Sequence, residues 1–320
     1  DREGLYFLCS EKNYYIKNHF NFMDVSIILV NYNTTRLLLQ AIDSIYEKSA
    51  GFTFEVIVVD NNSSENPEKE IREKYGDQIT LISLSENIGF GKANNEGIKI
   101  AKGRYIFLLN TDTYLINNAI YILMQYMDTH LDVGSCGGNL YNAQLQHTYS
   151  YHKIPYGIRS YEVSVLTMGF SRRFVKYPFY NTSENAIEVG NISGADMMLR
   201  KSVLDTVGIF DPDFFMYCEE SELSWRIRKA GYKNINVPQA KIVHLEGKSS
   251  KIVEHRKLME LDGRKKYYIK TRGILYFKIA NILLLCGVTL RCILYTLNNN
   301  RKLKKEYKKL GGLIYKAYYK

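Results

Sequence analysis

Short apolar runs alternate with helix-like segments over the first part of the chain. The runs VSIILVNYN (25–33), FEVIVVD (54–60), ITLISLS (79–85) and RYIFLLN (104–110) are rich in Val, Ile and Leu and have the length of strands. Between them, apolar residues recur at the spacing of amphipathic helices, as in TTRLLLQAIDSIYEKS. Near-continuous apolar strands that alternate with helices predict an α/β fold with a mostly parallel sheet covered on both faces.

Polar side chains follow every one of these strands. Ligands of such sheets bind beyond the carboxyl ends of the strands, so this edge is the expected site. It carries Asn31-Tyr32-Asn33, Asp60-Asn61-Asn62, Ser85-Glu86-Asn87 and Asn110-Thr111-Asp112.

The middle of the chain is less regular and then becomes ordered again. Residues 141–190 are rich in Tyr and contain Pro155 and Pro178, which predicts loops that cover the site. After Gly190 we expect an apolar segment at 196–199, a helix through Val207, and a helix at 219–230 that begins with acidic residues and ends at Gly231. One or two short strands then carry His244.

The last 50 residues change in character. The segment 273–297 has only Lys278 and Arg291 as charged residues, and a basic stretch, NNNRKLKKEYKKLGG, follows it. Its uninterrupted apolar core, 279–290, is shorter than the ~20 residues of a spanning helix. An in-plane amphipathic helix on an anionic membrane surface is therefore expected. A membrane span, a buried C-terminal helix and a dimer interface remain alternatives.

The charge of the chain is unevenly distributed. The 320 residues carry a formal net charge of +10, and residues 241–320 hold 20 Lys and Arg against 5 Asp and Glu. The preceding residues are therefore net acidic, which argues against a nucleic-acid binder and for a basic tail that addresses a membrane. Five scattered cysteines fit a reducing compartment, and residues 1–22 form an N-terminal extension without a secretory signal. Cytoplasmic residence is expected.

Strand-end carboxylates are the first candidates for chemistry. Asp60 can accept hydrogen bonds from a base or ribose, and Asp112 in NTDT can reach a metal or a diphosphate. A lone aspartate at a strand end is usually a turn residue or a helix cap, but the two together on one edge are more informative. The glycines of ENIGFGKANNEG follow the third strand instead of the first, which disfavours a dinucleotide-binding fingerprint, and no P-loop motif occurs.

An acidic run and one histidine are the second group of candidates. Glu219, Glu220 and Glu222 lie at a predicted helix start behind the aromatic segment FDPDFFMY. Clustered carboxylates in a partly apolar pocket can tune a general base, whereas a solvated helix N-terminus is the alternative. His244 is a candidate metal ligand or a structural histidine. Oxygen ligands with one imidazole suit Mn²⁺ or Mg²⁺.

Taken together and in order, these motifs are similar to those of a known enzyme family. VSIILVNYN, VVDNNSSE, ENIGFGKANNEGI, LLNTDT, ISGADMMLRKSVLDTVGIFDPDFFMYCEESELSWRIRKAGY and the late His244 resemble the inverting glycosyltransferase family two with the GT-A fold, especially its rhamnosyltransferase-like branch. The resemblance covers about residues 24–270. It implies transfer of a sugar from a nucleotide-diphosphate sugar (dTDP-rhamnose or a UDP-hexose) to an acceptor hydroxyl, with inversion.

The resemblance also implies roles for particular residues. Asn31, Tyr32 and Asp60 would line the nucleoside site, and Asn87, Phe90, Asn95, Asn110 and Thr111 would border the donor. Gly194, Ala195, Asp196 and Glu222 would face the donor sugar or acceptor. Asp112, with His244, would hold Mn²⁺ or Mg²⁺, although Asn110 replaces the first acid of the family's metal motif. Glu220, with Glu219 beside it, occupies the place of the catalytic base, where the family has an aspartate.

These inferences give one model of the protein. Residues 23–270 form the GT-A domain, with a nucleotide-binding half at 23–140 and an acceptor half at 141–270, and residues 271–320 form the basic amphipathic tail. We expect an enzyme of surface polysaccharide or glycolipid synthesis that is peripheral on the inner face of the cell membrane. Its acceptor would be a saccharide or a polyprenyl-linked molecule, and no nucleic-acid partner is expected. A catalytically degenerate module that binds a nucleotide sugar is the alternative, and an oligomer is compatible with both.

Overall fold

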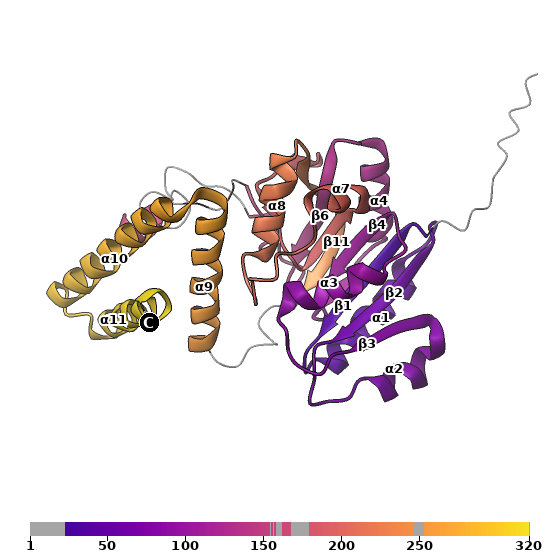
Figure 1. Ribbon diagram of the computed structural model, residues 1–320, viewed down its shortest axis with the longest axis horizontal. Coiled ribbons are helices and arrows are strands. Elements are labelled where there is room, and N and C mark those ends of the chain that lie inside the picture. The colour runs from indigo at the N-terminus through magenta and orange to yellow at the C-terminus, as the bar shows by residue number, and fades with distance from the viewer. Residues whose placement is uncertain are drawn as a thin grey trace, which may run out of the picture.

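The structure is a computed structural model that describes residues 23–153, 155, 157, 162–167, 179–245 and 253–319. The N-terminal extension expected at residues 1–22 lies outside this range. In Figure 1 the α/β body occupies one end of the molecule, and the last three helices form a separate layer at the other end.

A mixed sheet organises the body. In the described part of the chain it has nine strands, in the order β3-β2-β1-β4-β10-β6-β11-β5, with β8 paired to β11. These strands are β1 (Val25–Asn31), β2 (Phe54–Asp60), β3 (Ile79–Ser83), β4 (Tyr105–Leu109), β5 (Thr113–Leu115), β6 (Val133–Tyr141), β8 (Ile187–Glu188), β10 (Asp196–Arg200) and β11 (Lys233–His244). A two-stranded sheet pairs β7 (Tyr151–His152) with β9 (Asn191–Ile192).

Strand direction changes in the middle of the main sheet. β1 to β4 run parallel to one another, as the alternating strand and helix pattern predicted. β10 then pairs antiparallel with both β4 and β6, and β11 runs parallel to β6. The predicted α/β fold with a sheet flanked by helices is confirmed, and the sheet is mixed because β10 and β5 pair antiparallel with their neighbours.

Helices cover both faces of the sheet. The helices of the body are α1 (Thr35–Lys48), α2 (Glu68–Tyr75), the short 3-10 helix η1 (Gly76–Gln78), α3 (Phe90–Ile100), α4 (Ala119–Thr129), α7 (Lys201–Val207) and α8 (Glu219–Lys229). The short helix α5 (Glu162–Leu166) packs instead on the C-terminal helix α10 (Ile274–Leu297). Side chains of α1, α2 and α4 pack on one face, and those of α3, α7 and α8 pack on the other.

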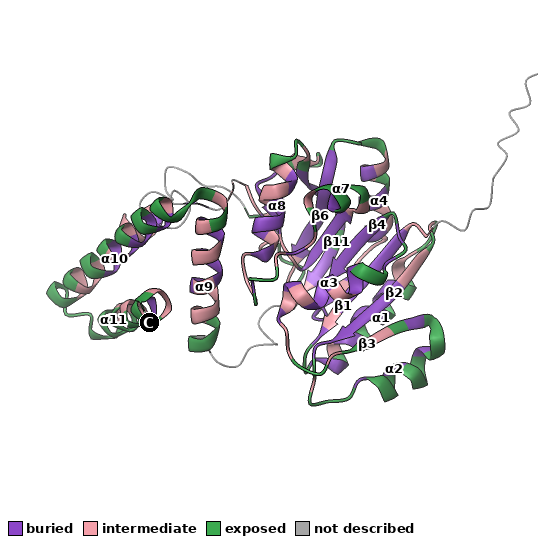
Figure 2. Cartoon of the chain, viewed as in Figure 1, coloured by how far each residue is buried: buried purple, intermediate pink, exposed green. Residues whose placement is uncertain are grey.

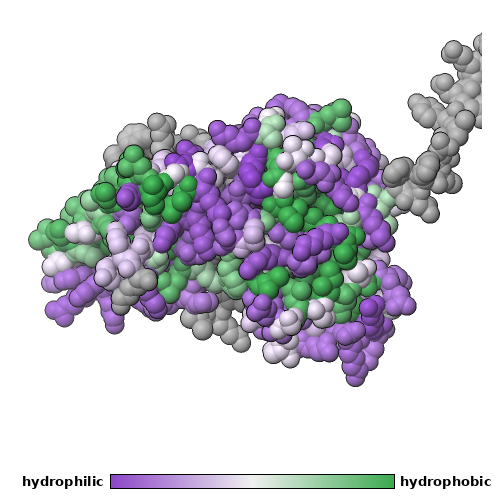
Figure 3. Space-filling view, in the orientation of Figure 1, coloured by the Kyte–Doolittle hydropathy of each residue, from purple (hydrophilic) through white to green (hydrophobic). Residues whose placement is uncertain are grey.

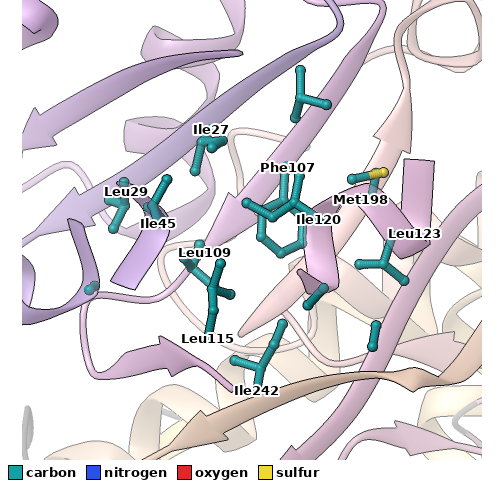
Figure 4. Close-up of a cluster of buried hydrophobic side chains, with 14 of the residues drawn as sticks. Ile27, Leu29, Ile45, Phe107, Leu109, Leu115, Ile120, Leu123, Met198 and Ile242 are labelled. Atoms are coloured by element: carbon teal, nitrogen blue, oxygen red, sulfur yellow. The ribbon is translucent and has the colours of Figure 1, made fainter. Parts of the chain in front are cut away.

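Alternation along the strands builds these two layers. Ile27 and Leu29 of β1 face the α1 and α4 side, where they lie with Phe107 and Leu109 of β4 (Figure 4). The intervening Ile28 faces the opposite layer. Because successive strand side chains point to opposite faces, one continuous apolar run supplies both cores. The strands are accordingly the most buried part of the body in Figure 2.

The C-terminal part consists of three helices, α9 (Val253–Arg272), α10 (Ile274–Leu297) and α11 (Arg301–Tyr319). They pack on one another, and α9 also contacts α8 of the body. Of the described helices, α10 alone is long and apolar enough to cross a membrane, although one of its sides is buried in the protein. The domain boundary expected at residue 271 falls inside α9.

Two local expectations differ from the structure. Within 141–190, expected as loops, the described residues form β7, α5, β8 and the end of β6. The short strands expected around His244 are a single strand, β11, with an irregular register between Asn236 and Lys241. That stretch contains Pro238, which has no N–H to donate to a neighbouring strand, and prolines in sheets are confined to such places.

Candidate active site

The ends of β1 and β2 meet in a buried polar network. Asn31 and Asp60 are partners in the parallel register, and Asn31 Nδ2 donates to Asp60 Oδ1 at 2.8 Å. The Asp60 carboxylate also accepts from the hydroxyl and backbone N–H of Ser63, at 2.6 and 3.1 Å. Tyr32 follows β1 and is 44% exposed, so its ring lies at the open side of this network.

The loop between β3 and α3 is fixed by amide side chains. Asn87 Oδ1 accepts from Asn61 Nδ2 and from the backbone N–H of Gly89, both at 3.0 Å. Gly89 has φ of +90°, and a Cβ there would lie 2.2 Å from the carbonyl oxygen of Phe215. Only glycine fits this close approach, which brings the start of α3 against the segment that precedes α8.

Asn95 has a structural partner. Its amide donates to the carbonyl of Phe210 at 2.8 Å and accepts from the N–H of the same residue at 3.0 Å. The side chain is buried and holds α3 to the 208–214 segment. We therefore assign Asn95 to this junction and no longer expect it at the donor.

The motif after β4 brings Thr111, Asp112 and His244 to the same edge. Thr111 Oγ1 lies 2.9 Å from Thr34 Oγ1, next to the Asn31 network. Asp112 Oδ1 lies 3.3 Å from His244 Nε2, because β5 and β11 pair antiparallel and place His244 opposite Thr113. Asn110 Oδ1 is buried and has no hydrogen-bond partner in the described part of the protein.

These donors fit a hard divalent cation. The Asp112 carboxylate and the His244 imidazole lie 3.3 Å apart, near the roughly 3 Å that separates two adjacent ligands of one ion, and the unpartnered amide oxygen of Asn110 is two residues from Asp112. Oxygen donors with one nitrogen suit Mn²⁺ or Mg²⁺. The described residues hold no cluster of three or more His, Cys, Asp or Glu, so further ligands would have to come from the donor diphosphate or solvent.

Residues 194 and 195 connect the Asp112 motif to α8. The carbonyl of Ala195 accepts from the N–H of Asn110 at 3.0 Å. A methyl group on Gly194 would lie 3.6 Å from the Phe90 ring and 3.9 Å from Glu220 Cβ. Gly194 and Ala195 therefore lie between the Asp112 motif and Glu220.

Asp196 does not face this space. Its side chain is fully buried between β4 and β6, and Oδ2 accepts from the N–H of Gly138 at 2.6 Å. Oδ1 has no partner among the described atoms. Burial raises the pKa of Asp196 well above its usual range, which favours the protonated form of the side chain. Its expected contact with donor sugar or acceptor is not supported by this placement.

A strained turn begins α8 and aims the two glutamates. Tyr217 and Cys218 have φ of +71° and +69°, a region that bulky L-residues rarely adopt and that clusters at functional sites. Glu219 is buried, whereas Glu220 is half-buried and its Oε1 accepts from Ser221 Oγ at 3.2 Å. Burial raises the pKa of both carboxyls, and the charge of Glu220 raises that of Glu219 further.

Glu222 belongs to a different interaction. Its carboxylate accepts from Arg226 Nη2 at 2.7 Å, and the same guanidinium donates to the carbonyls of Val207, Gly208 and Ile209. The pair fixes the turn after α7 to α8. Glu222 is thus occupied as a structural group, which leaves Glu220 and Glu219 as candidate bases.

A cavity of about 240 Å³ opens beside Glu220. α8 and its strained turn form one wall, α9 forms the opposite wall, and two aromatic residues close the space. The lining residues are Tyr149, His152, Tyr217, Cys218, Glu220, Ser221, Arg256, Lys257, Glu260, Leu261 and Arg264. Glu219 is not among them. This difference favours Glu220 as the group that meets an acceptor.

Several of these side chains escaped the sequence analysis. Ser63 appears in NNSSE, but only the fold shows that its hydroxyl binds the Asp60 carboxylate. Tyr149 and His152 come from the Tyr-rich middle segment, where burial lowers the pKa of His152 to about 4. The α9 wall gives no local signal, because its charged residues resemble any solvated helix.

The comparisons with known proteins agree with the fold. The glycosyl transferase family 2 model matches residues 26–208, and the glycosyl transferase family group 2 model matches residues 121–303. The chain therefore belongs to glycosyl transferase family 2 and has its GT-A fold.

Curated relatives cover part of the chain. It is 26% identical over 214 residues to the poly-beta-1,6-N-acetyl-D-glucosamine synthase of Staphylococcus aureus, which covers 65% of this chain and 47% of that protein. It is 33% identical over 115 residues to the minor teichoic acid biosynthesis protein GgaB of Bacillus subtilis, covering 35% of this chain and 13% of that protein. The chain thus spans about half the length of the synthases it matches. Neither relative is named a rhamnosyltransferase, so that branch is not supported by them.

Solved structures share the fold. The mannosyltransferase PcManGT from Pyrobaculum calidifontis, in complex with GDP-Man and Mn²⁺, has a TM-score of 0.58 at 17% identity and covers 91% of this chain and 83% of its own. GalNAc-T7 with UDP, GalNAc and Mn²⁺ also has a TM-score of 0.58, at 14% identity, covering 80% of this chain and 52% of that chain.

Proposed function

We propose that the chain transfers a sugar from a nucleotide-diphosphate sugar to an acceptor hydroxyl, with inversion and with Glu220 as the general base. The observation that carries this proposal is the position of Glu220, half-buried at a cavity and beside Gly194 and Phe90. Family membership supports the reaction class, and the cavity supports the assignment of the base.

The proposed mechanism needs no protein nucleophile. Glu220 removes the proton of an acceptor hydroxyl in the cavity while that oxygen attacks the anomeric carbon from the side opposite the diphosphate. Burial raises the pKa of Glu220, which brings its proton affinity closer to that required of a base working near neutral pH. Burial and the charge of Glu220 raise the pKa of the neighbouring Glu219 well above its usual range, which disfavours a second negative charge beside the base.

The donor is proposed to bind at the strand ends. Asn31, Tyr32, Asp60 and its neighbours would meet the nucleoside, and Asn87, Phe90 and Thr111 would border the rest of the donor. Asp112 and His244, with Asn110 nearby, would hold Mn²⁺ or Mg²⁺. When bound, this cation neutralises charge on the departing diphosphate.

The biological setting is also a proposal. The relatives named above act in poly-N-acetylglucosamine and teichoic acid synthesis, which supports a role in assembly of a surface polysaccharide or glycolipid. A UDP-hexose, including an N-acetylhexosamine, is our preferred donor, and dTDP-rhamnose is the second. We propose action at the inner face of the cell membrane on a saccharide or polyprenyl-linked acceptor.

Glu220→Gln tests the base, with Glu219→Gln as its neighbour control. After a thermal-shift screen identifies the donor, transfer is measured as nucleoside diphosphate release with and without acceptor. We expect Glu220→Gln to lower kcat by about 100-fold or more with the donor Kd unchanged, since general-base catalysis contributes roughly that much. Full transfer by a folded Glu220→Gln protein would assign the base elsewhere.

Asp112→Asn tests the donor side separately. We expect weaker Mn²⁺-dependent donor binding, measured by calorimetry, even where no transfer is followed. Tight donor binding by the wild-type chain without turnover on any acceptor would instead favour the nucleotide-sugar-binding module.

A further inference from the structure

One face of α10 exposes a continuous row of apolar side chains. The row, called here the apolar stripe, consists of Leu275, Ile279, Ile282, Cys286, Leu290, Ile293 and Leu297, and all seven are exposed. Their spacing of three or four residues keeps them on one side of the helix. In Figure 3 this side forms an apolar area at the end of the molecule away from the body.

The opposite face of α10 is occupied by protein. Phe277 packs with Tyr267 and Tyr268 of α9, and Leu284 packs with Leu261 of α9 and Ile314 of α11. A Cβ on Gly287 would lie 2.9 Å from the backbone nitrogen of Leu166, so α10 also approaches α5 closely. The helix is therefore one-sided, with one face in the protein core and one face left uncovered.

Positive charge lies beside the stripe. α11 carries seven Lys or Arg against one Glu, and all seven cations are exposed, while its apolar side packs on α9 and α10. Lys278 is the one cation within the exposed face of α10. An apolar face flanked by cations complements a lipid surface with anionic headgroups better than it complements a second cationic copy of the same helices.

We infer that the apolar stripe is the membrane-docking surface and that α10 lies in the plane of an anionic leaflet instead of crossing it. This inference rests on the proposed function, because it names the surface by which the enzyme would bind the inner face of the cell membrane. A span would place lipid around the whole helix, which would remove α10 from α5, α9 and α11 and expose the Asn281 and Arg291 side chains to hydrocarbon. The long stem of Lys278 can reach the headgroups from within the stripe.

Ile282→Asp tests the stripe, and Leu131→Asp is its matched control. Both side chains are exposed, at 60% and 75%, but Leu131 lies in the body between α4 and β6. The full chain is sedimented with phosphatidylcholine vesicles with and without phosphatidylglycerol. We expect binding only to the anionic vesicles, at least about tenfold weaker for Ile282→Asp and unchanged for Leu131→Asp, because a charge replaces one inserted apolar side chain.

A fluorescent label on Cys286 reports independently whether the apolar stripe enters the membrane. In a Cys9→Ser, Cys218→Ser, Cys292→Ser background, an environment-sensitive fluorophore on Cys286 should shift to shorter wavelength on anionic vesicles, and alkaline carbonate should release the protein. Retention after carbonate would indicate a span and would overturn the in-plane arrangement.

Two further outcomes would also overturn the inference. Equal vesicle binding by Ile282→Asp and wild type would place the docking surface elsewhere. A wild-type dimer in sedimentation velocity that becomes a monomer in Ile282→Asp, without vesicle binding by either, would assign the stripe to an interface between copies. Donor turnover in detergent is measured in parallel. It tests the transferase assignment independently of the membrane-docking inference.

Discussion

Gly263→Ala examines how α9 positions the proposed base. Gly263 lies in the interior of α9, where a Cβ would meet the carbonyl oxygen of Tyr217 at 2.3 Å and its carbonyl carbon at 3.1 Å. Tyr217 and Cys218 form the strained turn that starts α8. Since contacts of a Cβ below 3.0 Å are essentially never seen, the turn and α9 must separate by about 0.7 Å or more.

The stability change is the difference between two opposing effects. Inserting a methyl group into a packed contact costs about 1–3 kcal/mol. Replacing a mid-helix glycine by alanine gains about 1 kcal/mol. Gly312→Ala in α11 supplies the second effect alone, because nothing lies within 4 Å of a Cβ there. We expect Gly312→Ala to be slightly stabilising and Gly263→Ala to be less stable than it by about 1–3 kcal/mol.

The functional change should be larger than the change in stability. A displacement approaching 1 Å at the turn that carries Glu220 can lower kcat about 100-fold, with a much smaller effect on donor binding. Urea unfolding followed by the fluorescence of Trp225, the single tryptophan, measures stability. Acceptor-dependent kcat and donor KM measure function. Wild-type kcat in Gly263→Ala, with normal stability, would refute the reasoning that α9 positions Glu220.

Three other predictions follow from buried charges. The folded chain holds the proton of Asp196 more tightly than the unfolded chain does, so the free energy of unfolding should fall as pH rises above the ordinary aspartate pKa of 3.8. Asp196→Asn should remove this fall in melting curves, and an unchanged pH dependence in the variant would contradict the prediction. Burial raises the pKa of Glu220, so kcat/KM should decline on acidification with a midpoint above 4.5, and a lower midpoint would exclude this group as the base. Arg226→Ala should lower the free energy of unfolding by about 3 kcal/mol because it leaves Glu222 buried and unpaired, whereas Arg226→Lys should retain part of the stability. The midpoints of denaturant unfolding of the two variants test this.

The sequence predicted the N-terminal half of the fold well because that half is built from local signals. Each parallel strand is an apolar run followed by polar residues, and the adjacency of Asn31 and Asp60 follows from the parallel order alone. Family resemblance then selected Glu220 and Asp112 for roles that remain proposals.

The features that the sequence did not predict depend on contacts between segments that are distant along the chain. Asn95 reads as a donor residue in GKANNEG, yet its amide binds the backbone of Phe210, 115 residues later. Asp196 follows the glycine of ISGAD but turns into the sheet, where antiparallel β10 buries it between β4 and β6. The α9 wall was not expected either, because its packing on the Tyr217 turn requires the glycine at 263.

α9 contributes to the cavity beside Glu220 but not to the polar network at the edge of the sheet. It contributes the far wall of the cavity and carries α10 and α11 on its other side, but it makes no part of the network at the ends of β1 and β2. If the cavity receives the acceptor as proposed, substitutions on α9 should alter which hydroxyl enters it while donor choice is preserved. Acceptor selectivity would then depend on these last helices, and donor selectivity on the edge of the sheet.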